Sequence, residues 1–300
     1  MGSGPAVPGP EADAAVAPDG RRRWLTYLAV AGPGLIAANA GNDAGGIVTY
    51  ASAGAQFGYR TLFFMLLVTV ALVVVQEMCS RLGAFTGKGL AALIREEFSL
   101  RLASFAIFFL VVANVGLVVS EFAGIGAALE LLGVSKFISV PVAALGIWAL
   151  VIFGSYRYAE RLFLLLSLVF VTYPIAAFLG HPRWSSVAAD TLAPHFVGSK
   201  SFVLLGVALI GTTITPYMQF YLTSAVVDKG VTPETYKSER IDTINGAILS
   251  DVVSIFIIIA TAAAIGGTGA LTSASQAAHA LVPVAGQAAE TLFGLGLLGA

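Results

Sequence analysis

Charged side chains are scarce in this chain of 300 residues. Asp, Glu, Lys and Arg make up 11% of it, whereas an average soluble protein carries about 25%. Hydrophobic residues account for 57%, and the mean hydropathy is +0.88. This composition indicates an all-α polytopic membrane protein whose surroundings are the lipid bilayer. The net charge of −1 gives no basic surface for nucleic acid, so we exclude nucleic acid as a partner.

Cysteine and the common catalytic motifs are also missing or nearly so. The single cysteine, Cys79, excludes an intrachain disulfide and a multi-cysteine metal cluster, and we expect it to be a packing residue in a helix. The sequence contains neither the phosphate-binding GxxxxGK[ST] motif nor HExxH, and its three histidines lack metal-ligand spacing. We therefore expect no enzyme and no bound cofactor.

Apolar runs divide the chain into expected membrane spans of about 17 residues or more, the length that crosses the hydrocarbon core. The expected spans are residues 24–50, 61–80, 102–132, 137–153, 162–179, 202–227, 244–265 and 281–300. Residues 1–23 read as a disordered cytoplasmic tail and 24–300 as the transmembrane domain. Residues 181–200 are expected to be an irregular loop. The chain stops inside an apolar segment, so we expect about eight spans of a longer bundle.

Basic residues are distributed unequally between the two sides of these spans. With a cytoplasmic N-terminus, 12 of the 16 Lys and Arg residues lie inside. The outside set is Arg60, Lys136, Arg183 and Lys200. The positive-inside rule therefore favours this orientation in the inner, or plasma, membrane.

A lone carboxylate, Asp43, interrupts the first apolar run. A charge within a span costs about 2.5–3.5 kcal/mol on insertion scales, so it predicts a functional site. Gly41, Gly45 and Gly46 flank it and favour a break in the helix. Broken helices at membrane depth persist where they line a cavity. A carboxylate on a broken span is typical of an ion site in a secondary transporter.

The sixth span contains a second interruption at Thr215-Pro216-Tyr217. Proline removes a backbone hydrogen bond and clashes with the preceding turn. The two broken spans are five spans apart and start on opposite sides of the membrane, as inverted repeats would place them. We assign residues 24–180 to the first repeat and 201–300 to part of the second.

The candidate metal ligands are all oxygen atoms around these two breaks. Asp43 would neutralise a cation, and the carbonyl groups of Ala40 and Thr212 are further hard donors. Asn42 would supply a side-chain oxygen or else a local cap. Thr215 and Tyr217 offer hydroxyl groups. Met218 is out of phase with Thr215, so we interpret it as a packing residue.

Two other acids lie within the expected spans. Glu77 precedes Arg81 by four residues, which predicts an ion pair on one helix face. Glu121 has no basic residue on its turn and is therefore a candidate carboxylate for supporting the ligands, relaying protons or holding a second ion. On these residues alone, an amino-acid or other organic-substrate symporter that uses Asp43 for an ammonium or sodium ion stays open.

The motifs resemble those of the natural resistance-associated macrophage protein (Nramp) family. The family's first span carries Gly-Pro-Gly, Asp-Pro-Gly-Asn and Gly-Ala-Gln-Phe-Gly-Tyr. The corresponding segments here are Gly32-Pro33-Gly34, Asp43-Ala44-Gly45-Gly46 and Gly54-Ala55-Gln56-Phe57-Gly58-Tyr59. Gln76 to Lys88 resembles the second-span motif, and Glu121 the glutamate of the third-span Asp-x-x-Glu motif. The resemblance implies a LeuT-type fold of eleven or twelve spans and divalent-metal transport.

The departures from the family pattern concern selectivity. Gly46 stands where the family has asparagine, and Thr215 stands where it has the methionine of Met-Pro-His. Val118 and Tyr217 replace the aspartate and histidine of the proton route. This pattern resembles the Nramp-related magnesium branch, which implies import of Mg²⁺, and also Mn²⁺, without proton coupling. The alternative is a proton-coupled Mn²⁺/Fe²⁺ importer.

Overall fold

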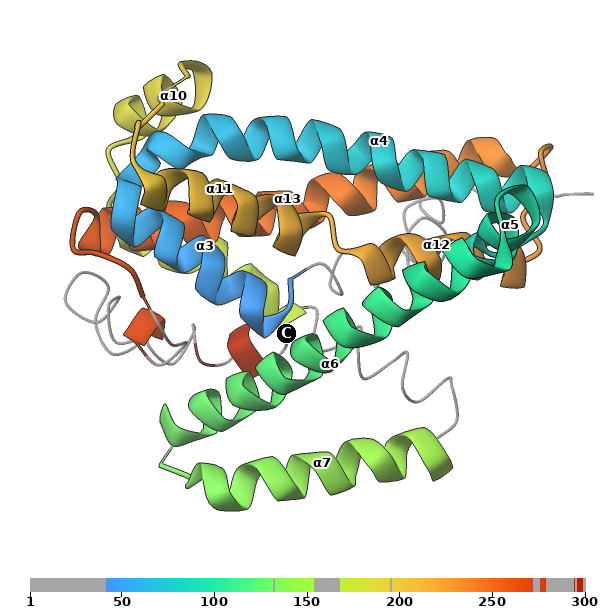
Figure 1. Ribbon diagram of the computed structural model, residues 1–300. Coiled ribbons are helices and arrows are strands. Elements are labelled where there is room, and N and C mark those ends of the chain that lie inside the picture. The colour runs from blue at the N-terminus through green and yellow to red at the C-terminus, as the bar shows by residue number, and fades with distance from the viewer. Residues whose placement is uncertain are drawn as a thin grey trace, which may run out of the picture. The chain divides into compact units, whose positions relative to one another are not determined.

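The computed structural model describes residues 42–131, 133–153, 168–194, 196–271, 276–278, 294 and 296–298. These residues form helices and connecting turns, without a strand among them (Figure 1). The expected tail 1–23, Ala40, the first half of the first span and nearly all of the eighth lie outside the described residues. Within these ranges, five helical stretches are long and apolar enough to cross a membrane.

The first described helix, α3 (Ala44–Phe57), begins directly after Asp43. A single 3-10 turn, η1 (Gly58–Thr61), joins it to α4 (Leu62–Thr86) where a loop was expected. Helix α4 continues past the predicted end at residue 80. It stops at Gly87, whose φ of 64° is the left-handed conformation that glycine adopts without steric cost.

The polar connection after α4 contains a helix that the prediction left out, α5 (Leu90–Glu97). It is short and amphipathic, so it lacks the long apolar run by which the spans were recognised. The third and fourth expected spans are confirmed as α6 (Leu100–Leu131) and α7 (Lys136–Phe153). Large apolar side chains along both helices are exposed, as a surface in contact with lipid requires.

The structure describes the end of the fifth expected span as η2 (Leu168–Val171) and α9 (Thr172–Leu179). The expectation of an irregular segment over 181–200 is wrong for α10 (Trp184–Leu192), a short helix between the prolines of that stretch. Such a helix is too short to show the apolar run of a span.

The sixth expected span is broken, as predicted. It consists of α11 (Lys200–Thr213) and α12 (Pro216–Asp228), separated by Ile214 and Thr215. The seventh span is α13 (Tyr236–Ile265), which begins before the predicted residue 244. The prediction started late because the first turns of this helix are polar and do not belong to the apolar run.

Helix α13 lies at the centre of the packing and contacts α3, α4 and α9. The closest approach is at Gly54 of α3, where a Cβ atom would lie 2.2 Å from Thr261 Oγ1 and 2.4 Å from the Ile258 carbonyl oxygen. Buried side chains such as Ile47 and Ile257 fill the space between these helices. The glycine lets α3 and α13 pack directly against each other near the end of α3.

An ionic cluster joins the far ends of α4 and α13. Glu77 pairs with Arg81 at 3.5 Å, which confirms the predicted i,i+4 contact. It also accepts a hydrogen bond from the Tyr236 hydroxyl at 2.8 Å and pairs with Arg240 at 3.3 Å. Cys79, two residues further along α4, is buried, as expected of a packing residue.

Candidate metal site

Asp43 is the N-cap of α3. Its backbone is extended, with φ −68° and ψ 164°, and its carboxylate accepts a hydrogen bond from the Gly46 N–H. The side chain is 7% exposed. A helix N-terminus carries partial positive charge and free N–H groups, so a side-chain oxygen acceptor is favoured at this position. The charge that interrupts the apolar run is therefore held at a helix end, as the glycine pattern predicted.

The second break places its polar groups in a comparable way. Helix α11 ends at Thr213, and Ile214 leaves the helical conformation with φ −106° and ψ 65°. Thr215 is extended, and Pro216 then occupies the first turn of α12. Proline is well tolerated at that position because the N–H it lacks has no partner within the helix. Pro216 thus begins a helix rather than kinking one.

The two breaks and the middle of α6 line an open cavity of about 300 Å³. Its lining comes from the start of α3, from α6 and from both halves of the broken sixth span. The lining residues are Asp43, Gly45, Thr49, Ala113, Asn114, Gly116, Leu117, Ser120, Gly211, Thr212, Thr215, Pro216 and Tyr217.

Oxygen dominates the polar groups of this cavity. Besides the Asp43 carboxylate, hydroxyl groups come from α3, α6, α11 and α12 and from Thr215 in the second break, where the Thr215 hydroxyl is buried and interacts with that of Tyr217. No sulfur atom is in the described lining, since Met218 is buried on α12 outside the cavity. A carboxylate with hydroxyl and carbonyl oxygens suits hard divalent cations that keep part of their water.

The cavity differs from a conventional protein metal cluster. The described residues contain no group of three or more His, Cys, Asp or Glu side chains that could hold a metal ion. The candidate ligand set here is one carboxylate with neutral oxygens.

Glu121 lies beside the first break. Its carboxylate accepts a hydrogen bond from the Ala44 N–H at 3.2 Å, so Glu121 and Asp43 share the N-terminus of α3. Glu121 is not among the lining residues. Its position fits a carboxylate that holds the start of α3 against α6, and it is close enough to Asp43 to influence a bound charge.

Asn42 is not among the residues that line the cavity. Its amide group donates to the Ser250 carbonyl and hydroxyl oxygens at 3.2 and 3.1 Å, and its Oδ1 accepts from the Ser254 hydroxyl at 2.9 Å. These contacts attach the residue before Asp43 to α13. The metal-ligand role of Asn42 stays a prediction.

Gly46 lies beside the site without lining it. A Cβ atom there would be 3.1 Å from both Asp43 Oδ1 and Thr212 Oγ1. The glycine therefore lets the two breaks approach each other closely. Ala40, the remaining predicted ligand, lies outside the described residues.

Sequence reasoning missed several polar groups of this region. Asn114 and Ser120 line the cavity from α6, and only their polarity within an apolar span could have indicated them. Asp251 was also missed, although it could have been predicted. It is 1% exposed in the middle of α13, and the argument that selected Asp43, a lone acid in an apolar run, applies to it equally.

Comparison with known proteins identifies the group to which this fold and site belong. The chain is 33% identical to the divalent metal cation transporter MntH of Ralstonia nicotianae, over 92% of this chain and 66% of the relative. It is also 33% identical to MntH 1 of Pseudomonas aeruginosa, over 90% and 64%. The chain thus spans about two thirds of the length of these relatives.

A solved structure shares the fold. A mutant of the manganese transporter of Eremococcus coleocola superposes with a TM-score of 0.72 at 24% identity, over 95% of this chain and 64% of that one. This likeness supports the predicted LeuT-type architecture with broken first and sixth helices. The family model described as natural resistance-associated macrophage protein-like matches residues 34–300. The chain belongs to the Nramp family.

Proposed function

We propose that this protein is a secondary transporter that imports divalent metal ions, Mg²⁺ and also Mn²⁺, by alternating access and without proton coupling. The observation that carries the proposal is the cavity in which Asp43 meets the hydroxyl groups of Thr212, Thr215 and Tyr217. The relatives are divalent metal cation transporters, which supports the substrate class. In this proposal the protein lies in the inner membrane with its N-terminus in the cytoplasm.

The proposed roles follow from position. Asp43 neutralises the ion, and the Thr212 carbonyl and hydroxyl groups complete a sparse set of direct ligands. Thr215, Tyr217 and Gly46 shape the space that bound water occupies. Mg²⁺ gives up its water reluctantly, so a cavity of about 300 Å³ that admits a partly hydrated ion suits it.

Uptake into proteoliposomes tests the site. We expect Asp43→Asn to abolish Mg²⁺ and Mn²⁺ uptake because the amide leaves the ion's charge uncompensated. Asp228→Asn, the same change at the exposed end of α12 away from the cavity, is the matched control and should transport normally. Full uptake by the Asp43 variant would refute the assignment.

Selectivity has its own test. The thioether of Thr215→Met is a soft ligand and should shift relative uptake from Mg²⁺ towards Mn²⁺ and Cd²⁺. Met218→Leu, which changes a thioether outside the cavity, should leave the ratio unchanged. An unaltered ratio in the Thr215 variant would remove the argument for a hard-ligand site.

A proton-coupled Mn²⁺/Fe²⁺ importer is the second candidate, favoured by the position of Glu121 next to Asp43 and by the manganese named for the solved relative. A pH-sensitive dye inside the vesicles separates the two, because only the coupled carrier acidifies the lumen as metal enters. An organic-substrate symporter would show no specific divalent binding in isothermal titration.

A further inference from the structure

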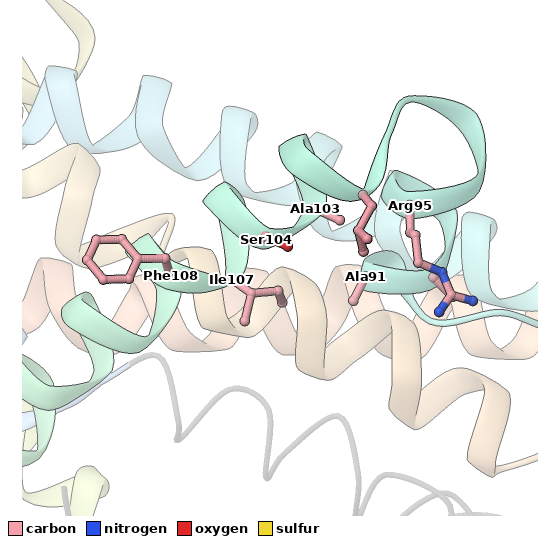
Figure 2. A pocket seen from close by; sticks show the side chains of 8 residues that line it. Ala91, Arg95, Ala103, Ser104, Ile107 and Phe108 are labelled. Carbon is pink, nitrogen blue, oxygen red and sulfur yellow. The ribbon is translucent and has the colours of Figure 1, made fainter.

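A second pocket lies away from the metal site, between α5 and the beginning of α6. It has a volume of about 540 Å³. Figure 2 shows its lining, with Ile107 and Phe108 at one end and Arg95 at the other. Ala91 and Ser104 are also in the lining. The pocket therefore combines a largely apolar wall with one cation.

The position of this pocket relative to the membrane follows from its two helices. Helix α6 is a membrane span, and the pocket lies along its first turns, from Leu100 to Phe108. Helix α5 packs against it and belongs to the polar connection between two spans. An amphipathic helix at the end of a span lies at the membrane interface. The pocket is thus where headgroups meet acyl chains.

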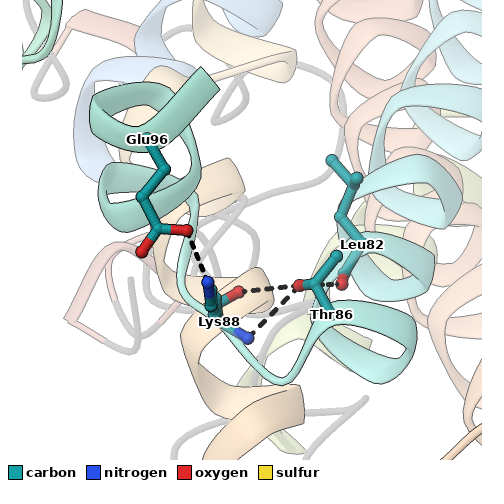
Figure 3. Close-up of polar contacts among 4 residues, drawn as sticks. All are labelled: Leu82, Thr86, Lys88 and Glu96. Carbon is teal, nitrogen blue, oxygen red and sulfur yellow. Dashed lines mark hydrogen bonds and ion pairs between the residues drawn. The ribbon is translucent and has the colours of Figure 1, made fainter. Parts of the chain in front are cut away.

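Arg95 is the charge available to a ligand in this pocket. It is exposed and has no acidic side chain within ion-pair distance among the residues that the structure describes. Its neighbour Glu96 is engaged elsewhere. Figure 3 shows the Glu96 carboxylate bound by the Lys88 ammonium group, which holds the pKa of the Glu96 carboxyl below its usual value.

The same contacts fix the turn that leads into α5. The Lys88 N–H donates to the Thr86 hydroxyl at 3.2 Å, and that hydroxyl donates to the Leu82 carbonyl at 2.6 Å. Helix α5 is therefore attached to the end of α4 through Lys88. Lys88 and Glu96 neutralise each other, and Glu97 at the end of α5 is not in the lining. Arg95 is therefore the one charged side chain among the described residues that line the pocket.

We propose that this pocket binds an anionic phospholipid of the surrounding membrane, with the headgroup phosphate at Arg95 and an acyl chain along Ile107 and Phe108. Charge complementarity selects the occupant, because a guanidinium group binds phosphate through two parallel hydrogen bonds. Basic pockets at the cytoplasmic ends of membrane helices suit anionic headgroups. The orientation indicated by the Lys and Arg distribution places this pocket on that side.

Lipid retention by the purified protein in detergent tests the proposal. Native mass spectrometry is carried out with added dioleoyl phosphatidylglycerol, with dioleoyl phosphatidylcholine and with inorganic phosphate. We expect phosphatidylglycerol to be retained and to raise the melting temperature more than phosphatidylcholine with the same chains. Inorganic phosphate alone should do neither, because it has no acyl chain.

Two variants and one control locate the site. Arg95→Gln should bind phosphatidylglycerol about fivefold more weakly, which corresponds to about 1 kcal/mol per basic residue at an anionic surface. Ala91→Leu fills the pocket, keeps the charge and should also reduce retention. Arg101→Gln removes an exposed arginine outside the lining and should not.

Three results would overturn the proposal. The first is equal retention of phosphatidylglycerol by the protein and by its Arg95 and Ala91 variants. The second is equal retention of the two lipids. The third is a stabilisation by inorganic phosphate that matches that of phosphatidylglycerol, which would assign the pocket to a free anion.

Discussion

The hydroxyl group of Tyr50 on α3 lies 2.9 Å from that of Thr213, the last residue of α11. Tyr50 is fully buried, and its hydroxyl also interacts with Ser254 of α13. One side chain thus joins the helix that follows the first break, the helix that precedes the second break, and the central helix of the core. The two halves of the candidate metal site are held together through it.

Removal of the Tyr50 hydroxyl group should destabilise the protein. Tyr50→Phe leaves the Thr213 hydroxyl buried without its partner, so we expect a loss of about 1–3 kcal/mol in the free energy of unfolding. A double-mutant cycle with Thr213→Val, followed by thermal or denaturant unfolding in detergent, should give a coupling energy of about 0.5–1.5 kcal/mol. Strictly additive effects would show that the contact contributes nothing.

Asn42 offers a test between anchoring and direct metal binding. If Asn42 positions Asp43 through α13, Asn42→Ala and Ser254→Ala should both weaken Mg²⁺ binding, because each loses the bond that fixes the chain before Asp43. Isothermal titration measures both affinities. Weak binding by the Asn42 variant alone, with Ser254→Ala unchanged, would instead make the Asn42 side chain a ligand.

Gly46 should be intolerant of even a methyl group. In Gly46→Ala the new Cβ lies 3.1 Å from Asp43 Oδ1 and from Thr212 Oγ1, so these two side-chain oxygen atoms must shift by a few tenths of an ångström. Crowding of this kind costs about 1–3 kcal/mol. We expect lower stability together with weaker Mg²⁺ binding. Gly206→Ala on α11, where a Cβ is only in ordinary contact with Phe64 at 3.6 Å, is the control and should change neither property.

The two breaks were predictable because their signals are local. A lone Asp43 among glycines and a Pro216 between polar residues each mark a position where a helix is readily interrupted, whereas Pro141, between two valines, lies inside α7. The structure places Asp43 and Pro216 at helix starts. Most span limits followed from apolar runs for the same reason.

Other features depend on contacts that no local pattern encodes. The partners of Asn42 are more than two hundred residues away on α13. The short helices α5 and α10 lack a long apolar run and so resembled loops. The Asn114 and Ser120 side chains belong to the cavity only because α6 crosses both breaks. Tertiary packing decides each of these.

Close packing of α3 on α13 gives a prediction about the fold. In Gly54→Ala the new methyl group would lie 2.2 Å from Thr261 Oγ1 and 2.4 Å from a backbone carbonyl oxygen, so the helices must separate. We expect the free energy of unfolding to fall by about 1–3 kcal/mol, seen as a lower melting temperature in detergent. The Gly206→Ala variant again serves as control. An unchanged melting temperature would mean that the two helices separate without cost.

The buried carboxyl group of Asp251 should lower the stability of the folded protein. Neither of its carboxyl oxygens has a hydrogen-bond partner within the described residues. The nearby Thr69 hydroxyl interacts with it but donates its own hydrogen bond to the Met65 carbonyl at 2.8 Å. Replacing an unsatisfied buried polar group by an apolar one of similar shape is neutral or stabilising.

We therefore expect Asp251→Leu to raise the free energy of unfolding by about 1–3 kcal/mol, measured by thermal unfolding in detergent. Asp43→Leu, which loses the bond from the Gly46 N–H, is the contrasting variant and should show no such gain. A loss of stability in Asp251→Leu would mean that the carboxyl group has a stabilising partner. If the variant is more stable but no longer transports metal, the carboxyl group of Asp251 is needed for transport and lowers stability. Acids within membrane spans commonly have such functional roles.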